Sequence, residues 1–193
     1  MLYPQVAQAQ AGLVALPSAL ARLLLSFLPG RAIPSLLGVS HTARRLCACL
    51  HKLDLSSYEK LDDVRFVSSL VELRTLNLSD CSEQLVDVSP SSSLTLLNTL
   101  YLGCVHEDHY SQLADVSPLS ALVALETLHL VGCEQLIDVS PLSTLTSLAS
   151  LDMSRCGQLR NVSPLSTLTS LISLNLSRCS QLSDARLSRP SPP

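Results

Sequence analysis

The polar segment 105–110, with the sequence Val-His-Glu-Asp-His-Tyr, is the first candidate for chemistry. It holds two histidines and two carboxylates, and these residue types are common zinc ligands. No other ligand set accompanies the segment in the chain, so we interpret it as a polar excursion on a loop that could form part of a partner site. The Cys47-Ala48-Cys49-Leu50-His51 stretch is a weak zinc pattern because Cys47 lies in the phase of a core position. We therefore expect no metal and no cofactor.

Motifs of the common enzyme classes are missing from the sequence. There is no Gly-rich phosphate loop and no nucleophile motif, and scattered Ser, His and Asp are frequent enough to coincide by chance. The net charge of -3 has the wrong sign for a general nucleic-acid binder, which normally presents a basic face. We expect no catalytic residues, no enzymatic activity and no nucleic-acid partner.

The seven cysteines do not resemble a disulfide framework. They are odd in number, and five of them recur at one position of a repeat, where a buried thiol acts as a small apolar side chain. The apolar run at residues 13–29 has no preceding Lys or Arg, is interrupted by Pro17 and Arg22, and is too short to span a bilayer. We expect reduced thiols, no signal peptide, no membrane association, and a cytoplasmic or nuclear location.

The elements that would position these residues come from a repeat. Leu128, Leu151 and Leu174 follow one another at intervals of 23 residues, and each is followed two positions later by another apolar residue. The same pattern runs back through coils of 28, 24 and 23 residues, which makes six units with the last incomplete. The cysteines that recur near the end of each predicted strand are Cys81, Cys104, Cys133, Cys156 and Cys179.

Each unit predicts one short strand and one turn. The Leu-x-Leu alternation places both leucines on one side of a strand, and successive strands would add to a parallel sheet that needs burial. The recurring Asp-Val-Ser-Pro-Leu segment predicts a short helical turn, with Ser as its cap and Pro at its first position. Its leucines at the third and sixth places would point inward. The Ser-Pro pairs could also be phosphorylation sites, but their register favours the turn.

The pattern resembles the leucine-rich-repeat family, whose signature is Leu-x-x-Leu-x-Leu-x-x-(Asn or Cys)-x-(x)-Leu, and the short turn is similar to that of internalin-type repeats. The resemblance covers residues 50–187 and implies an α/β solenoid of about six coils with a parallel sheet on the concave face. In this family the recurring Cys turns inward and bonds loop backbone groups. Residues 1–12 would be disordered, residues 13–49 a small helical cap, and residues 188–193 a tail.

The segment at residues 13–49 resembles an F-box. The matching residues include Leu16, Pro17, Leu20, Phe27 and Leu28, while Ala19 and Ala43 stand where Glu and Trp are usual. If the resemblance holds, a Skp-type adaptor of a cullin ubiquitin ligase would contact Leu16, Pro17, Leu20, Leu24, Phe27 and Leu28. The alternative is that these helices only cap the apolar first coil.

The concave face is the usual binding surface of a curved solenoid. Its outward residues between the paired leucines would be Asp54, Asn77, Tyr101, His129, Asp152 and Asn175. Because interface energy concentrates in Trp, Tyr and Arg, we add Arg155 and Arg178 and expect Tyr101 and these two arginines to be the main contacts. The sequence thus predicts a protein-interaction module, with an F-box substrate receptor as one form of it. The alternative is a structural or surface repeat protein.

Overall fold

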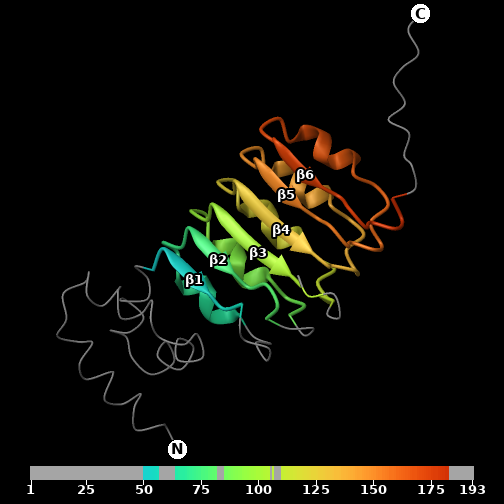
Figure 1. The fold of residues 1–193 in the computed structure, drawn as a ribbon. Coiled ribbons are helices and arrows are strands. Elements are labelled where there is room, and N and C mark those ends of the chain that lie inside the picture. The colour runs from blue at the N-terminus through green and yellow to red at the C-terminus, as the bar shows by residue number, and fades with distance from the viewer. Residues whose placement is uncertain (1–49, 57–63, 82–84, 105, 107–109, 183–193) are drawn as a thin grey trace, which may run out of the picture.

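The computed structural model describes residues 50–56, 64–81, 85–104, 106 and 110–182. In these ranges six parallel strands form one sheet in chain order (Figure 1). The strands are β1 (Lys52–Asp54), β2 (Thr75–Asn77), β3 (Thr99–Gly103), β4 (Thr127–Val131), β5 (Ser150–Asp152) and β6 (Ser173–Asn175). The 3-10 helices between them are η1 (Arg65–Ser69), η2 (Ser89–Ser93), η3 (Ser117–Ala121), η4 (Ser140–Thr144) and η5 (Ser163–Thr167).

Equivalent residues of successive coils lie in register. Leu100 pairs with Leu76 on one side and with Leu128 on the other, and each 3-10 helix packs against the next one along the solenoid. The sheet and the row of 3-10 helices enclose the core, as the sequence predicts. The helical cap and F-box-like segment predicted for residues 13–49, the end of the repeats at 183–187 and the tail predicted for residues 188–193 lie outside the described residues.

The core is a stack of aliphatic layers. In the fourth coil Leu128 and Leu130 point inward from β4, while Leu142 and Leu145 point inward from η4 and its end. The backbone holds this turn by bonds from the Leu142 N–H to Val139 O at 3.0 Å and from the Leu145 N–H to Leu142 O at 3.0 Å. The prediction that leucines at the third and sixth places of the turn face the core is confirmed.

The start of each turn differs from the prediction. Serine was expected to cap the helix, but Ser140 is the first helical residue and its own N–H is the group that needs an acceptor. Oδ1 of Asp138 supplies it, at 2.8 Å from the Ser140 nitrogen. This carboxylate lowers the cost of starting the turn, since it satisfies one of the first backbone donors. Val139 is the N-cap and forms no side-chain cap bond, so the acceptor for the first helical N–H comes from Asp138, one residue earlier, and Pro141 is the second residue of the helix.

The cysteine ladder is present, with one departure. The Cys81, Cys156 and Cys179 thiols donate to carbonyl oxygens of the preceding coil at 2.9, 3.3 and 3.1 Å. Cys104 was expected in the same row, but Gly103 pairs with Val131, which places Cys104 one residue short of it. Ser111 takes that place instead and forms a bridge with Cys133. The longer third coil causes the shift, because its extra residues precede the ladder position.

The last coil is the least covered. Leu174 of β6 is 42% exposed, whereas its counterparts in the four preceding strands are fully buried. Ile172, just before β6, is 89% exposed. A solenoid coil buries its apolar side chains against both neighbours, so β6 forms the edge of the sheet within the described residues.

Candidate partner-binding surface

The outward side chains of the strands form one column, which we call the sheet face. Backbone pairing aligns its members from β1 to β6. They are the residues that the sequence assigns to the concave surface, namely Asp54, Asn77, Tyr101, His129, Asp152 and Asn175. Asp54 is exposed and the others are partly buried, so the column is accessible along its whole length.

Four members of the sheet face end their own strands. In each of them the side-chain Oδ1 accepts a hydrogen bond from the backbone N–H of a serine two residues later, at 2.9 to 3.1 Å. Such a local bond competes with the ladder of the sheet, and each of these strands is three residues long. The pairs are Asp54 with Ser56, Asn77 with Ser79, Asp152 with Ser154, and Asn175 with Ser177.

The same side chains also bond to one another across coils. Asn175 Nδ2 donates to Asp152 Oδ2 at 3.0 Å. Partial burial raises the pKa of Asp152, but the bonds from Ser154 and Asn175 and the proximity of His129 outweigh burial and lower this pKa below its usual value. The pKa of Asp54 is lowered in a similar way, against the effect of burial, mainly by its bonds from Ser56. These groups have a structural role that the sequence analysis did not foresee.

Tyr101 and His129 interrupt this pattern in the middle of the sheet. Neither side chain can form the Asp or Asn turn, and their strands β3 and β4 continue for five residues. Their rings lie next to each other, with centroids 4.7 Å apart and planes inclined by 32°. An offset aromatic pair of this kind presents an apolar surface with polar edges. It is the part of the sheet face best suited to a protein contact.

Arg155 and Arg178 occupy a left-handed backbone position just before the ladder cysteines. The φ angle is 63° at Arg155 and 61° at Arg178, and it is 54° at Asp80 and 68° at Gly132 in equivalent places. Coil stacking imposes this conformation, since the Arg155 N–H donates to Ser177 O and the Gly132 N–H to Ser154 O, both at 2.9 Å. Glycine and aspartate adopt it readily, whereas other residues lose about 1–2 kcal/mol.

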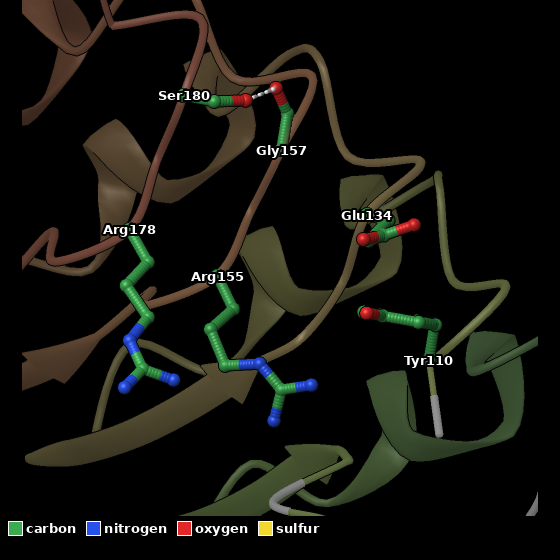
Figure 2. A pocket seen from close by; sticks show the side chains of 6 residues that line it. All are labelled: Tyr110, Glu134, Arg155, Gly157, Arg178 and Ser180. Carbon is green, nitrogen blue, oxygen red and sulfur yellow. Dashed lines mark hydrogen bonds between the residues drawn. The ribbon is translucent and has the colours of Figure 1, made fainter. Parts of the chain in front are cut away.

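A shallow depression of about 320 Å³ adjoins the two arginines (Figure 2). Its lining residues are Tyr110, Glu134, Arg155, Gly157, Arg178 and Ser180. Arg155 Nη1 donates to the carbonyl oxygen of His106 at 2.9 Å, and its guanidinium carbon lies 5.4 Å from the centre of the Tyr110 ring, a cation–π distance. His106 and Tyr110 of the third coil therefore contact Arg155 of the fifth, and Tyr110 lines the depression.

The structure thus separates the predicted site residues into three groups. Asp54, Asn77, Asp152 and Asn175 form bonds within the fold. Tyr101 and His129 form a ring pair, and Arg155 and Arg178 line the depression. The structure also joins Arg155 to Tyr110, which the sequence analysis had placed on a polar loop without linking it to the arginines. Ser180 was missed, and its only signal is its position two residues after Arg178. The predicted adaptor-binding residues lie outside the described part of the chain.

Among the residues that the structure describes, no group of three or more His, Cys, Asp or Glu side chains could hold a metal ion. Within the same ranges no helix has the length and apolar character needed to cross a bilayer.

Comparisons with known proteins concern the fold. No protein-family model matches the sequence, and no curated protein matches it. Among solved structures, internalin C2 of Listeria monocytogenes is 20% identical, with a TM-score of 0.47 and coverage of 77% of this chain and 92% of that one. The functional domain of InlJ from Listeria monocytogenes, a domain that includes a cysteine ladder, is 20% identical with a TM-score of 0.48. The match covers 69% of this chain and 31% of that one.

A leucine-rich-repeat protein of Leptospira interrogans is 19% identical, with a TM-score of 0.51 over 72% of this chain. This chain spans 40% of the length of that protein. The likeness agrees with the in-register parallel sheet, the stacked 3-10 helices and the buried leucine layers. The described residues form a leucine-rich-repeat solenoid.

Proposed function

We propose that this chain is a protein-binding module whose partner contacts the sheet face around Tyr101 and His129 and also contacts Arg155 and Arg178. The observation that carries this proposal is the break in the column of Asp and Asn residues. Those side chains are engaged in strand-ending and lateral bonds, whereas the middle of the column presents two adjacent rings.

Two physical arguments support this surface over the opposite side of the solenoid. Tyr and Arg contribute most to protein interfaces because they combine apolar area with directional donors. Tyr101, Arg155 and Arg178 concentrate both residue types between the third and sixth coils. Stacked coils also form a rigid frame, so little conformational freedom would be lost when a partner binds.

The experiment is affinity capture of partners with the full chain and with matched variants. Tyr101→Ser with His129→Ser removes the ring pair from the sheet face, and Val123→Ser is the control. Val123 is 54% exposed between η3 and β4, away from the sheet face. We expect one set of proteins to be retained by the wild type and the control and lost from the double variant. Equal retention by all three folded chains would contradict the proposal.

A second candidate function is substrate recognition in a cullin ubiquitin ligase, and the F-box-like pattern of Leu16, Pro17, Leu20, Phe27 and Leu28 favours it. In that case a Skp-type adaptor would bind the segment at residues 13–49 and the sheet face would select the substrate. Capture of the adaptor by the full chain and its loss in a Leu16→Ala, Pro17→Ala variant would support this function. A folded full chain that recovers no adaptor would leave the segment as a cap.

We propose a cytoplasmic or nuclear location on the basis of the cysteines. The five cysteines of the described residues are buried free thiols, which suits a reducing compartment. The alternative function, a structural or surface repeat protein, predicts secretion and oxidised cysteines. A thiol titration of the protein taken from its native compartment separates the two, since only the first predicts that all seven cysteines of the chain are reduced.

A further inference from the structure

We propose that Arg155 and Arg178 form a binding site for an oxyanion carried by a peptide segment of the partner. The oxyanion would be a phosphate group or a pair of neighbouring carboxylates. This inference rests on the proposed protein-binding function and names the chemistry that the partner would bring to the surface.

The two arginines are held next to each other by the repeat. They are 23 residues apart, one on each of two adjacent coils, and neighbouring rungs of a sheet are separated by about 4.8 Å. Figure 2 shows both side chains extending from their coils in the same direction beside the depression. An anion that lies between the two guanidiniums would be attracted to both.

Their backbone conformation is the second argument. The same position holds Gly132 in the fourth coil and Asp80 in the second, both of which tolerate a positive φ. Arginine is unfavourable there, yet it occurs in both of the last two coils. Unfavourable backbone conformations cluster at functional sites, where the side chain is needed in that place.

The surroundings fit an anion with an attached chain. Arg155 is oriented by the His106 carbonyl and the Tyr110 ring, and a guanidinium has five donors in a planar fork that matches phosphate and carboxylate oxygens. The Ser180 hydroxyl lines the same depression, where it donates to Gly157 O at 3.3 Å. Glu134 also lines it and would oppose an anion, so its removal should strengthen binding.

A peptide suits this site better than a nucleic acid. Nucleic-acid binding needs many phosphate contacts over a basic face, whereas the whole chain carries a net charge of -3. Two arginines beside the Tyr110 ring can instead bind a single charged side chain together with its apolar neighbours.

The test is an NMR titration of the full chain that follows the arginine Nε–Hε signals. The probes are N-acetyl-phosphoserine amide and N-acetyl-Glu-Glu amide, with N-acetyl-Gln-Gln amide as the neutral probe. We expect the signals of Arg155 and Arg178 to shift with at least one charged probe and not with the neutral one. A response to phosphoserine alone would identify a phosphorylated segment, and a response to the glutamates alone would identify an acidic one.

The matched variants separate the site from general charge. Arg155→Gly with Arg178→Gly removes both guanidiniums while it relieves the positive φ, and it should raise the dissociation constant on the order of tenfold or more. Arg160→Gln, which removes an exposed charge elsewhere, should leave binding unchanged. Glu134→Gln should tighten it. Should the glycine pair fail to fold, Arg155→Lys with Arg178→Lys keeps the charge but loses the fork, and we expect weaker binding.

No shift with either charged probe, or equal weakening by Arg160→Gln and the arginine pair, would overturn the inference. The titration contains no partner protein, so its failure would leave the proposed function to the capture experiment. A positive titration combined with a partner that ignores Tyr101 and His129 would instead overturn the proposed function alone.

Discussion

Ser91 is the clearest mismatch between a residue and its place in the repeat. The other described turns carry an apolar side chain at this position, namely Val67, Leu119, Leu142 and Leu165. Ser91 is 0% exposed, and its Oγ has no hydrogen-bond partner among the described residues. We therefore predict that Ser91→Ala stabilises the protein.

The magnitude follows from desolvation. A hydroxyl buried without a partner costs about 1–3 kcal/mol, and Ser91→Ala removes it without adding volume. Ser91→Val would add apolar contact worth about 0.8 kcal/mol per buried carbon, as long as the layer accepts the size that Val67 has in the neighbouring coil. Leu142→Ser creates the reverse situation and should cost about 3 kcal/mol or more, since it also leaves a cavity.

The assay is urea unfolding monitored by circular dichroism. The urea concentration at the midpoint is compared between variants whose transitions have the same slope. Ser92→Ala is the matched control, because Ser92 is only partly buried on the same turn and its hydroxyl already bonds locally to Ser89 O at 2.7 Å. Its effect should stay within about 0.5 kcal/mol. A lower midpoint for Ser91→Ala would refute the reasoning, because it would mean that the hydroxyl contributes a bond.

Three further predictions use the same unfolding assay. Gly132→Ala should lower the free energy of unfolding by about 1–3 kcal/mol, because φ is 68° there and a Cβ would lie 2.7 Å from Cys104 O. Gly157→Ala is the control, since its Cβ would meet nothing nearer than Ser180 Oγ at 4.0 Å. Asp152→Ala should cost about 1–3 kcal/mol by removing the acceptors for Ser154 and Asn175, and Asp152→Asn should recover part of it. Burial raises the pKa of Cys133 from 9.0 to about 12. As pH rises, the thiol loses its proton in the unfolded state before it does in the folded state. The contribution of Cys133 to the free energy of unfolding should therefore be constant below pH 9 and fall between pH 9 and 12. An equally steep fall of stability in Cys133→Ala would contradict this.

The repeat made most of the fold predictable. Leu128 and Leu151 mark the strands by alternation and by their spacing, and both lie where the pattern places them. Cys156 and Cys179 turn inward and bond backbone carbonyls of the preceding coil, Cys156 at Leu130 within β4 and Cys179 at Met153 just after β5. These features are predictable because each coil repeats the same packing problem, so six copies of one signal support one another.

The departures arise where a coil differs from its neighbours. Cys104 lies one residue short of the ladder, as the backbone pairing of Gly103 with Val131 shows. The sequence held a signal for this shift, because Cys104 follows Leu102 by two residues, whereas Cys133 follows Leu130 by three. The role of Asp138 as acceptor for the Ser140 N–H depends on which residue begins the helix. The left-handed conformation at Arg155 was visible only indirectly, through the glycine at the equivalent position 132.

The partner surface was predicted less fully than the fold. The sequence assigns all outward strand residues to one surface, but it does not distinguish Asp152, which ends its strand, from Tyr101 and His129, which pair with each other. Whether a polar side chain is used within the fold or presented to a partner depends on distances between coils, and those come only from the structure.

Site-directed photocrosslinking from the sheet face tests the central claim most directly. A photoreactive phenylalanine analogue would replace Tyr101 in one chain and Val123 in another, and crosslinked partners would be identified by mass spectrometry. We predict that one protein is crosslinked from position 101 and not from position 123. Equal crosslinking from both positions, or a partner crosslinked only from position 123, would contradict the account of the sheet face as the binding surface.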